Sequence, residues 1–204
     1  MTNIKMHVNE FNVNEEIVRE LLRSQFEEWA DLPLMLTQSS GTDNLVFRLG
    51  DDKCIRLPRI PGAEVQVKKE QRSLPFLAPF LSLEIPNPIG IGQPQDSYPS
   101  HWSIYNWIEG RDATNVENLD LNKAAVTLAK FINELHSIDS TGGPSTYRGR
   151  PLITRDEEVH KAIAELDGII DTTTSRKVWH ICKEATTWTK SPVWIHSDLL
   201  PANI

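Results

Sequence analysis

The sequence predicts an α+β fold built as two lobes, because strand signals fill its first half and helix signals its second. Residues 34–38, 44–49 and 53–57 form three short apolar or alternating runs, and a tight turn joins the last two. This pattern predicts an antiparallel meander. Residues 102–108 form one more apolar run. From residue 121 to 136 the apolar period changes to that of a single helix face.

The first half begins with a capping signal. Asn14 is followed by two glutamates, which favours the start of a helix that runs toward Trp29 and ends before Pro33. A second helical pattern covers residues 63–78. Prolines then recur between residues 86 and 99, so we expect a loop or an edge strand there.

The second half predicts three further helices and one strand. The helix over residues 121–136 has an apolar stripe at steps of four and three, and two more helical patterns cover residues 155–170 and 175–189. Residues 192–196 are a short apolar run that predicts a strand.

Composition is that of an ordinary soluble globular domain, with 39% hydrophobic and 24% charged residues in 204. A net charge of −7 disfavours binding to nucleic acid or to an anionic membrane. No apolar run reaches the length of a signal peptide or a membrane helix. Cys54 and Cys182 lack metal-like spacing, and we expect buried thiols in a reducing compartment, hence a cytoplasmic protein.

The strongest functional motif is His196-Ser197-Asp198, followed by Asn203. Kinase catalytic loops place an aspartate and an asparagine five positions apart, as His-x-Asp-x-x-x-x-Asn. The aspartate orients the attacking hydroxyl and accepts its proton, while the asparagine reaches a magnesium ion on the phosphates. The pattern therefore predicts Asp198 as a catalytic residue and Asn203 as a metal ligand.

The segment Trp194–Asn203 resembles the catalytic motif of the aminoglycoside phosphotransferase family, in which glycine is usual at the place of Ser197. The similarity extends from about residue 14 to the end of the chain. The resemblance implies a two-lobed protein-kinase-like fold and transfer of the γ-phosphoryl of ATP or GTP to a small-molecule hydroxyl, with Mg²⁺.

Two further segments match the family's nucleotide site. Ser39-Ser40-Gly41-Thr42 lies between two predicted strands, where the family has its nucleotide loop and backbone N–H groups approach phosphate. Arg56 stands where kinases carry the phosphate-binding lysine, with Cys54 at the place of the small residue that roofs the adenine. A guanidinium binds as a fork and not as a point charge, so this is a departure from the kinase pattern.

Glu70 falls on the apolar stripe of the 63–78 helix. A carboxylate on an apolar helix face is costly unless it is paired. Kinases bridge a helix glutamate to the phosphate-binding cation, so we expect an ion pair between Glu70 and Arg56.

Tyr105–Gly110 resembles the family's hinge, which divides the chain into a nucleotide-binding lobe, 1–108, and a partial helical lobe, 109–204. A complete member would continue into an Asp-Phe-Gly-like metal motif and substrate-binding helices. We expect a chain cut after its catalytic loop, inactive as 204 residues and open to self-association through the incomplete lobe.

The leading hypothesis is a small-molecule kinase that acts on an antibiotic-like molecule or a metabolite. A second hypothesis is a non-catalytic nucleotide-binding or scaffold module with a kinase-like fold. Catalytic turnover by the 204-residue chain would argue against this second hypothesis. A metal-dependent hydrolase that uses His196 and Asp198 is disfavoured, because the other histidines lack ligand spacing.

Overall fold

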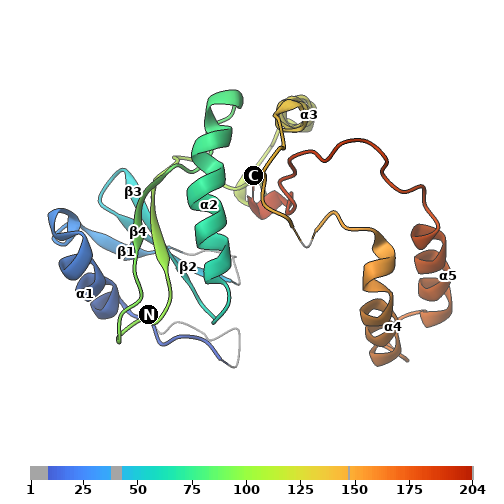
Figure 1. Cartoon of the computed structure of the whole chain (residues 1–204), viewed down its shortest axis with the longest axis horizontal. Coiled ribbons are helices and arrows are strands. Elements are labelled where there is room, and N and C mark those ends of the chain that lie inside the picture. The colour runs from blue at the N-terminus through green and yellow to red at the C-terminus, as the bar shows by residue number, and fades with distance from the viewer. Residues whose placement is uncertain (1–8, 38–42, 147, 204) are drawn as a thin grey trace. The chain divides into compact units, whose positions relative to one another are not determined.

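The structure is a computed structural model that describes residues 9–37, 43–146 and 148–203. The chain forms two compact units (Figure 1). The first unit comprises the described residues up to Ile138 together with those from Asp198 onward, and the second comprises Asp139–Ser197. The lobe boundary expected near residue 108 stays a prediction.

A five-stranded sheet forms the centre of the first unit, with the order β1-β2-β3-β5-β4 and every neighbouring pair antiparallel. The predicted meander is confirmed. The Pro-rich stretch contributes an edge strand, where a proline removes no ladder hydrogen bond from a neighbour. The strands are β1 (Leu34–Leu36), β2 (Asn44–Leu49), β3 (Lys53–Pro58), β4 (Pro88–Gly92) and β5 (Trp102–Asn106).

One face of this sheet packs on α1 (Glu15–Gln25) and forms the hydrophobic core. Asn14 caps the helix as predicted, since its side chain accepts a hydrogen bond from the N–H of Ile17 at 2.9 Å. The helix is shorter than predicted, because a separate 3₁₀ helix, Glu27–Trp29, follows it. The buried core combines α1 with alternate residues of the strands: Val18, Leu21, Leu22, Phe47, Leu49, Ile55, Leu57, Trp102 and Ile104.

The remaining helices of the first unit are α2 (Glu64–Leu77), with a 3₁₀ turn at Ala78–Phe80, and α3 (Leu121–Ser137). α2 lies beside β4 and β5. The segment after the 3₁₀ turn is joined to α3 by a hydrogen bond from Ser82 N–H to Glu134 at 2.8 Å. The stripe of α3 is buried only in its second half. Leu121 is 72% exposed.

The second unit contains a 3₁₀ helix, Leu152–Arg155, followed by α4 (Asp156–Glu165) and α5 (Thr172–Lys183). Asp156 joins the two helices, because its carboxylate accepts from Trp179 Nε1 at 2.7 Å and pairs with Lys183 at 2.9 Å. These contacts hold the pKa of Asp156 below its usual value. Both helices predicted for this part of the chain are present, but α4 is shorter than predicted and α5 begins and ends earlier than predicted.

Two predictions were wrong. Residues 192–196 are not a strand, since no segment within the described residues pairs with them, and an apolar run without a neighbour gains no ladder hydrogen bonds. Cys182 is exposed, although Cys54 is buried as expected. Cys182 lines the open groove between α4 and α5, and a two-helix unit is too small to enclose it.

Within the described residues, none of the helices has both the length and the apolar character needed to cross a membrane.

Replacing Gly92 by alanine is expected to destabilise the first unit, because the added Cβ would overlap the indole of the fully buried Trp102. Overpacking of this kind lowers the free energy of unfolding by about 1–3 kcal/mol. Urea unfolding should show that loss in Gly92→Ala. Gly110→Ala is the matched control, since its added Cβ meets nothing within 4 Å. A Gly92→Ala variant as stable as wild type would contradict the close packing of β4 on β5.

Candidate functional site

The predicted ion pair is present in the first unit. Nη1 of Arg56 on β3 lies 2.8 Å from Oε2 of Glu70 on α2, and the two side chains are 30% and 16% exposed. Strand alternation explains the geometry. Ile55 and Leu57 point into the core, so Arg56 points to the opposite face, the one that α2 covers.

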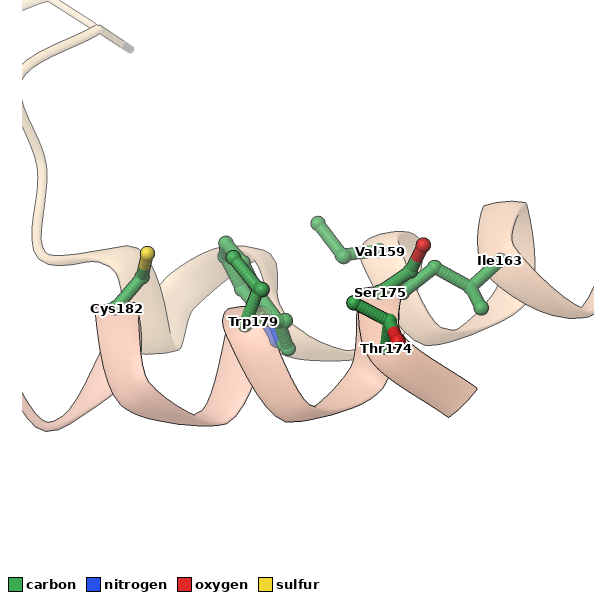
Figure 2. Close-up of a pocket in the computed structure, with 7 residues that line it drawn as sticks. Val159, Ile163, Thr174, Ser175, Trp179 and Cys182 are labelled. Atoms are coloured by element: carbon green, nitrogen blue, oxygen red, sulfur yellow. The ribbon is translucent and has the colours of Figure 1, made fainter. Parts of the chain in front are cut away.

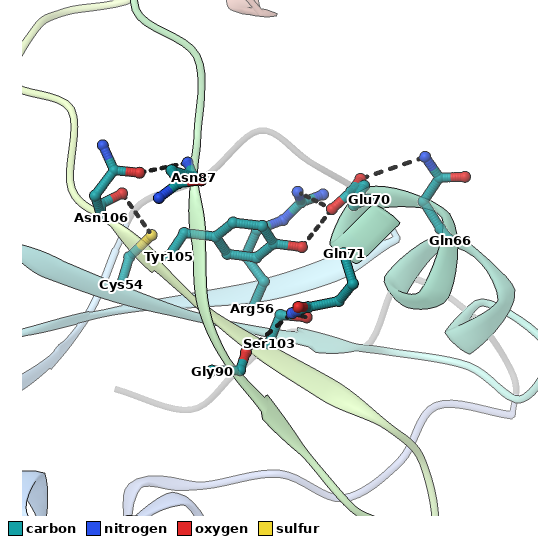
Figure 3. A network of polar contacts seen from close by, with 10 residues as sticks. All are labelled: Cys54, Arg56, Gln66, Glu70, Gln71, Asn87, Gly90, Ser103, Tyr105 and Asn106. Atoms are coloured by element: carbon teal, nitrogen blue, oxygen red, sulfur yellow. Dashed lines mark hydrogen bonds and ion pairs between the residues drawn. The ribbon is translucent and has the colours of Figure 1, made fainter. Parts of the chain in front are cut away.

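Glu70 accepts from two further donors (Figure 3). The hydroxyl of Tyr105 donates to Oε2 at 2.5 Å, and Gln66 Nε2 donates to Oε1 at 3.3 Å. Burial, and next the charge of Glu70, raise the pKa of Tyr105 well above its ordinary value. The phenol therefore keeps its proton and remains a donor to the carboxylate.

A second contact fixes α2 on the sheet beside the ion pair. Gln71 Nε2 donates at 3.0 Å both to the carbonyl of Gly90 on β4 and to the hydroxyl of Ser103 on β5. Two consecutive residues of α2 are thus hydrogen-bonded to two residues on the same face of β5: Glu70 to Tyr105, and Gln71 to Ser103. The rotation and register of α2 are fixed where Glu70 meets Arg56.

Cys54 lies opposite Tyr105 in the β3–β5 register. Its thiol approaches the carbonyl of Asn106 at 3.9 Å, and burial raises its pKa. The group at this position is consequently a neutral thiol.

The segment after β5 is anchored on both sides. Trp107 N–H donates to the carbonyl of Asp52 at 2.8 Å, and Asn106 Nδ2 donates to Glu84 at 2.9 Å. Arg48 of β2 forms an ion pair with Glu109 at 2.5 Å and lies over the ring of Trp107, 4.8 Å from its centroid. These contacts fix the chain where the hinge was predicted.

The Asp198–Asn203 loop closes on itself. Asn203 Nδ2 donates at 3.0 Å both to the carboxylate Oδ2 and to the backbone carbonyl of Asp198. The N–H of Leu200 also donates to that carbonyl at 3.0 Å, and Pro201–Asn203 forms a 3₁₀ turn that contacts Ala113–Asn115. The spacing of five residues therefore brings the carboxylate and the amide side chain together.

The structure places Arg56, Glu70, Asp198 and Asn203 in the first unit. It joins Arg56 to Glu70 and Asp198 to Asn203. Ser39, Ser40, Gly41 and Thr42 lie outside the described residues. Within the described ranges, no group of three or more His, Cys, Asp or Glu side chains could hold a metal ion.

Tyr105, Gln66 and Arg48 were not assigned from the sequence. An aromatic residue in an apolar strand is indistinguishable from a core residue in the sequence alone, and Arg48 resembles any polar residue of an alternating strand. One signal was available for Tyr105. It shares the alternation of Ser103 and not that of Trp102 and Ile104, which places it on the more polar face of β5.

The second unit contains an apolar groove of about 350 Å³ between α4 and α5 (Figure 2). Its two hydroxyls are already used in the start of α5, because Thr174 and Ser175 both donate to Asp171. The groove holds no acid, base or cation that could act on a substrate. It is lined by Val159, Ile163, Thr174, Ser175, Val178, Trp179 and Cys182.

Solved structures share this fold. The GDP complex of an aminoglycoside 2′-phosphotransferase IIIa variant aligns with a TM-score of 0.76 at 20% identity, over 93% of this chain and 65% of that chain. The GDP and kanamycin complex of APH(2″)-IIIa gives 0.70 at 20% identity, over 91% and 65%. The macrolide 2′-phosphotransferase MphH from Brachybacterium faecium gives 0.59 at 21% identity, over 92% and 66%. The predicted α+β, protein-kinase-like fold class is confirmed.

The sequence profile of the phosphotransferase enzyme family, APH, matches residues 37–204. The chain belongs to this family. No curated protein matches the chain. The chain spans 65% of the length of the first two solved structures described above.

Ser197 has a φ of +68°, which explains why glycine is favoured at this place in the motif. We expect Ser197→Gly to be as stable as wild type in urea unfolding, because glycine adopts this conformation without steric cost. Ser197→Val should be less stable than Ser197→Gly by about 1–2 kcal/mol, since a side chain, and a β-branched one most of all, is strained at positive φ. Equal stability of the glycine and valine variants would contradict the left-handed backbone at this position.

Proposed function

We propose that the protein is a phosphotransferase that moves the γ-phosphoryl group of ATP or GTP to a hydroxyl of a small molecule. The observation that carries the proposal is the Arg56–Glu70 ion pair between the sheet and α2, in a chain that belongs to a phosphotransferase family. A cation held on a strand by a helix carboxylate is the arrangement that kinases use to bind nucleotide phosphates.

Arg56 would bind the α- and β-phosphates. Within the described residues only Nη1 of its guanidinium makes a hydrogen bond or ion pair, to Glu70. Its other N–H groups can therefore donate to phosphate oxygens, in the fork that suits phosphate geometry. The backbone of Ser39, Ser40, Gly41 and Thr42 would complete the phosphate site, as expected from the sequence. Glu70 would orient the cation.

Asp198 would accept the proton of the attacking hydroxyl and orient it. Asn203 fits a Mg²⁺ ion, because its amide nitrogen is turned toward Asp198 and its amide oxygen is a hard ligand of the type that Mg²⁺ prefers. The ion would neutralise charge on the phosphates. One or two protein oxygens suffice for it, since phosphates and water supply the remaining ligands.

The acceptor class we propose is an aminoglycoside or macrolide antibiotic or a metabolite of similar polyhydroxyl character. Support comes from the solved relatives, which include a kanamycin complex and a macrolide 2′-phosphotransferase. The net charge of −7 is compatible with a cationic acceptor and unfavourable for nucleic acid. We place the protein in the cytoplasm, where nucleoside triphosphate is available. Self-association stays a prediction.

Arg56→Ala is expected to weaken the binding of Mg-ATP by about tenfold or more, because charge-assisted hydrogen bonds to phosphate contribute about 1.5–3 kcal/mol. Calorimetry measures the Kd. Arg19→Ala is the matched control, since Arg19 is 27% exposed and pairs with Glu15 at 2.9 Å, outside the proposed site. Equal affinity of the two variants would remove Arg56 from the nucleotide site.

Asp198→Asn is expected to lower phosphoryl transfer about 10²–10⁴-fold while nucleotide affinity stays close to wild type, because Asp198 acts on the acceptor hydroxyl. The assay follows transfer to a panel of hydroxyl acceptors with the full-length gene product. Wild-type turnover in Asp198→Asn would overturn the assignment of this loop. Nucleotide binding without transfer to any acceptor would favour a non-catalytic nucleotide-binding module.

A further inference from the structure

We propose that Tyr105 is a positioning residue of the nucleotide site, whose hydroxyl holds Glu70 in the orientation that presents Arg56 to phosphate. The inference rests on the proposed function, since it assigns a role within that site. Tyr105 touches both members of the ion pair (Figure 3).

The hydroxyl of Tyr105 and Nη1 of Arg56 share one oxygen of Glu70, Oε2. The other oxygen, Oε1, accepts from Gln66. Because both oxygens accept hydrogen bonds, the carboxylate has little rotational freedom. Without the hydroxyl, Arg56 would be the one remaining partner of Oε2 among the described residues. The flexible glutamate side chain could then adopt other rotamers, with or without Arg56.

The ring of Tyr105 contributes a second contact, because the Arg56 guanidinium carbon lies 5.5 Å from the ring centroid. Cation–π attraction favours this placement of the guanidinium. Tyr105 is only 1% exposed, so its own position is fixed by packing. Tyr105 thus contacts Glu70 with its hydroxyl and Arg56 with its ring.

Burial of the Tyr105 phenol keeps its hydroxyl protonated and therefore able to donate a hydrogen bond. Because the pKa of Tyr105 is raised by burial and by Glu70, the hydroxyl stays protonated over the working range of pH. A residue that supplied only packing would need no hydroxyl here, and a buried hydroxyl without an acceptor would be destabilising.

The first experiment compares Mg-ATP affinity in Tyr105→Phe and Tyr98→Phe. Tyr98 is the matched control, because it is fully buried and its hydroxyl also donates one hydrogen bond, to the carbonyl of Pro58 at 2.7 Å. Both variants should lose similar thermal stability. Only Tyr105→Phe should weaken binding, by about fivefold, which is less than the full effect of a lost hydrogen bond to a charged group because Tyr105 acts on phosphate only through Glu70 and Arg56.

A double-mutant cycle supplies a readout that a purely structural role would not move. In a Glu70→Gln background, Tyr105→Phe should change Mg-ATP affinity by less than about twofold, because the two residues act through one contact. Additive effects of Tyr105→Phe and Glu70→Gln would overturn the proposal. So would equal affinities of Tyr105→Phe and Tyr98→Phe when wild type binds Mg-ATP. Absence of binding by wild type would instead overturn the proposed function, and the inference with it.

A spectroscopic test does not depend on the folding of Tyr105→Phe. The chain has three tyrosines, so 3-fluorotyrosine gives three ¹⁹F signals, which Tyr98→Phe and Tyr147→Phe assign by elimination. Glu70→Gln should shift the Tyr105 signal and leave that of Tyr98 in place, and Mg-ATP should do the same in wild type. A Tyr105 signal indifferent to Glu70→Gln would refute the contact, whatever the outcome for nucleotide binding.

Discussion

Glu70 places a carboxylate on the side of α2 that faces the sheet, and residues of β3, β5 and α2 supply hydrogen-bond donors to it. A half-buried carboxylate is destabilising unless its lost hydration is replaced by donors. Arg56, Tyr105 and Gln66 replace it, and they come from β3, β5 and α2 itself. The contacts of Arg56 and Tyr105 therefore attach the helix to two strands, and the three contacts together hold a cation at a defined place. Stability and the proposed function depend on one set of contacts.

The sheet can accommodate this polar network because its other face supplies the hydrophobic core. Burial of Ile55, Leu57 and Ile104 against α1 gives the sheet a stabilising layer that does not involve Arg56 or Tyr105. Alternation separates the two roles within single strands. In β3 and β5 every second residue belongs to the core, and those between face α2. A one-residue change of register would place Arg56 in the core, so the apolar pattern fixes the position of the cation as firmly as the ion pair does.

Features that depend on neighbouring residues in the sequence could be predicted, whereas contacts between residues far apart in the sequence could not. The Asn14 cap, the meander and the place of Glu70 on its helix stripe are local patterns, and each is confirmed. Tyr105 could not be recognised as a partner of Glu70, because that contact joins residues 35 positions apart and the sequence does not show which strand neighbours β3. The error at residues 192–196 has a related cause. Apolar character is a property of the segment, whereas a strand also requires a neighbour.

The choice of arginine at position 56 and of tyrosine at position 105 is one structural solution. A lysine in place of Arg56 could pair with Glu70, but its ammonium is a compact charge that neither stacks on a ring nor divides its donors between two acceptors in a plane. The guanidinium uses Nη1 for Glu70 and approaches the ring of Tyr105, and its remaining N–H groups make no other hydrogen bond within the part of the chain that the structure describes. The phenol restricts the orientation of this planar cation through the hydroxyl contact with Glu70 and through its ring. Arginine at the position of the kinase lysine and tyrosine on β5 are therefore complementary. The guanidinium must be held in one orientation to present its N–H groups, and Tyr105 contacts both the guanidinium and its carboxylate partner.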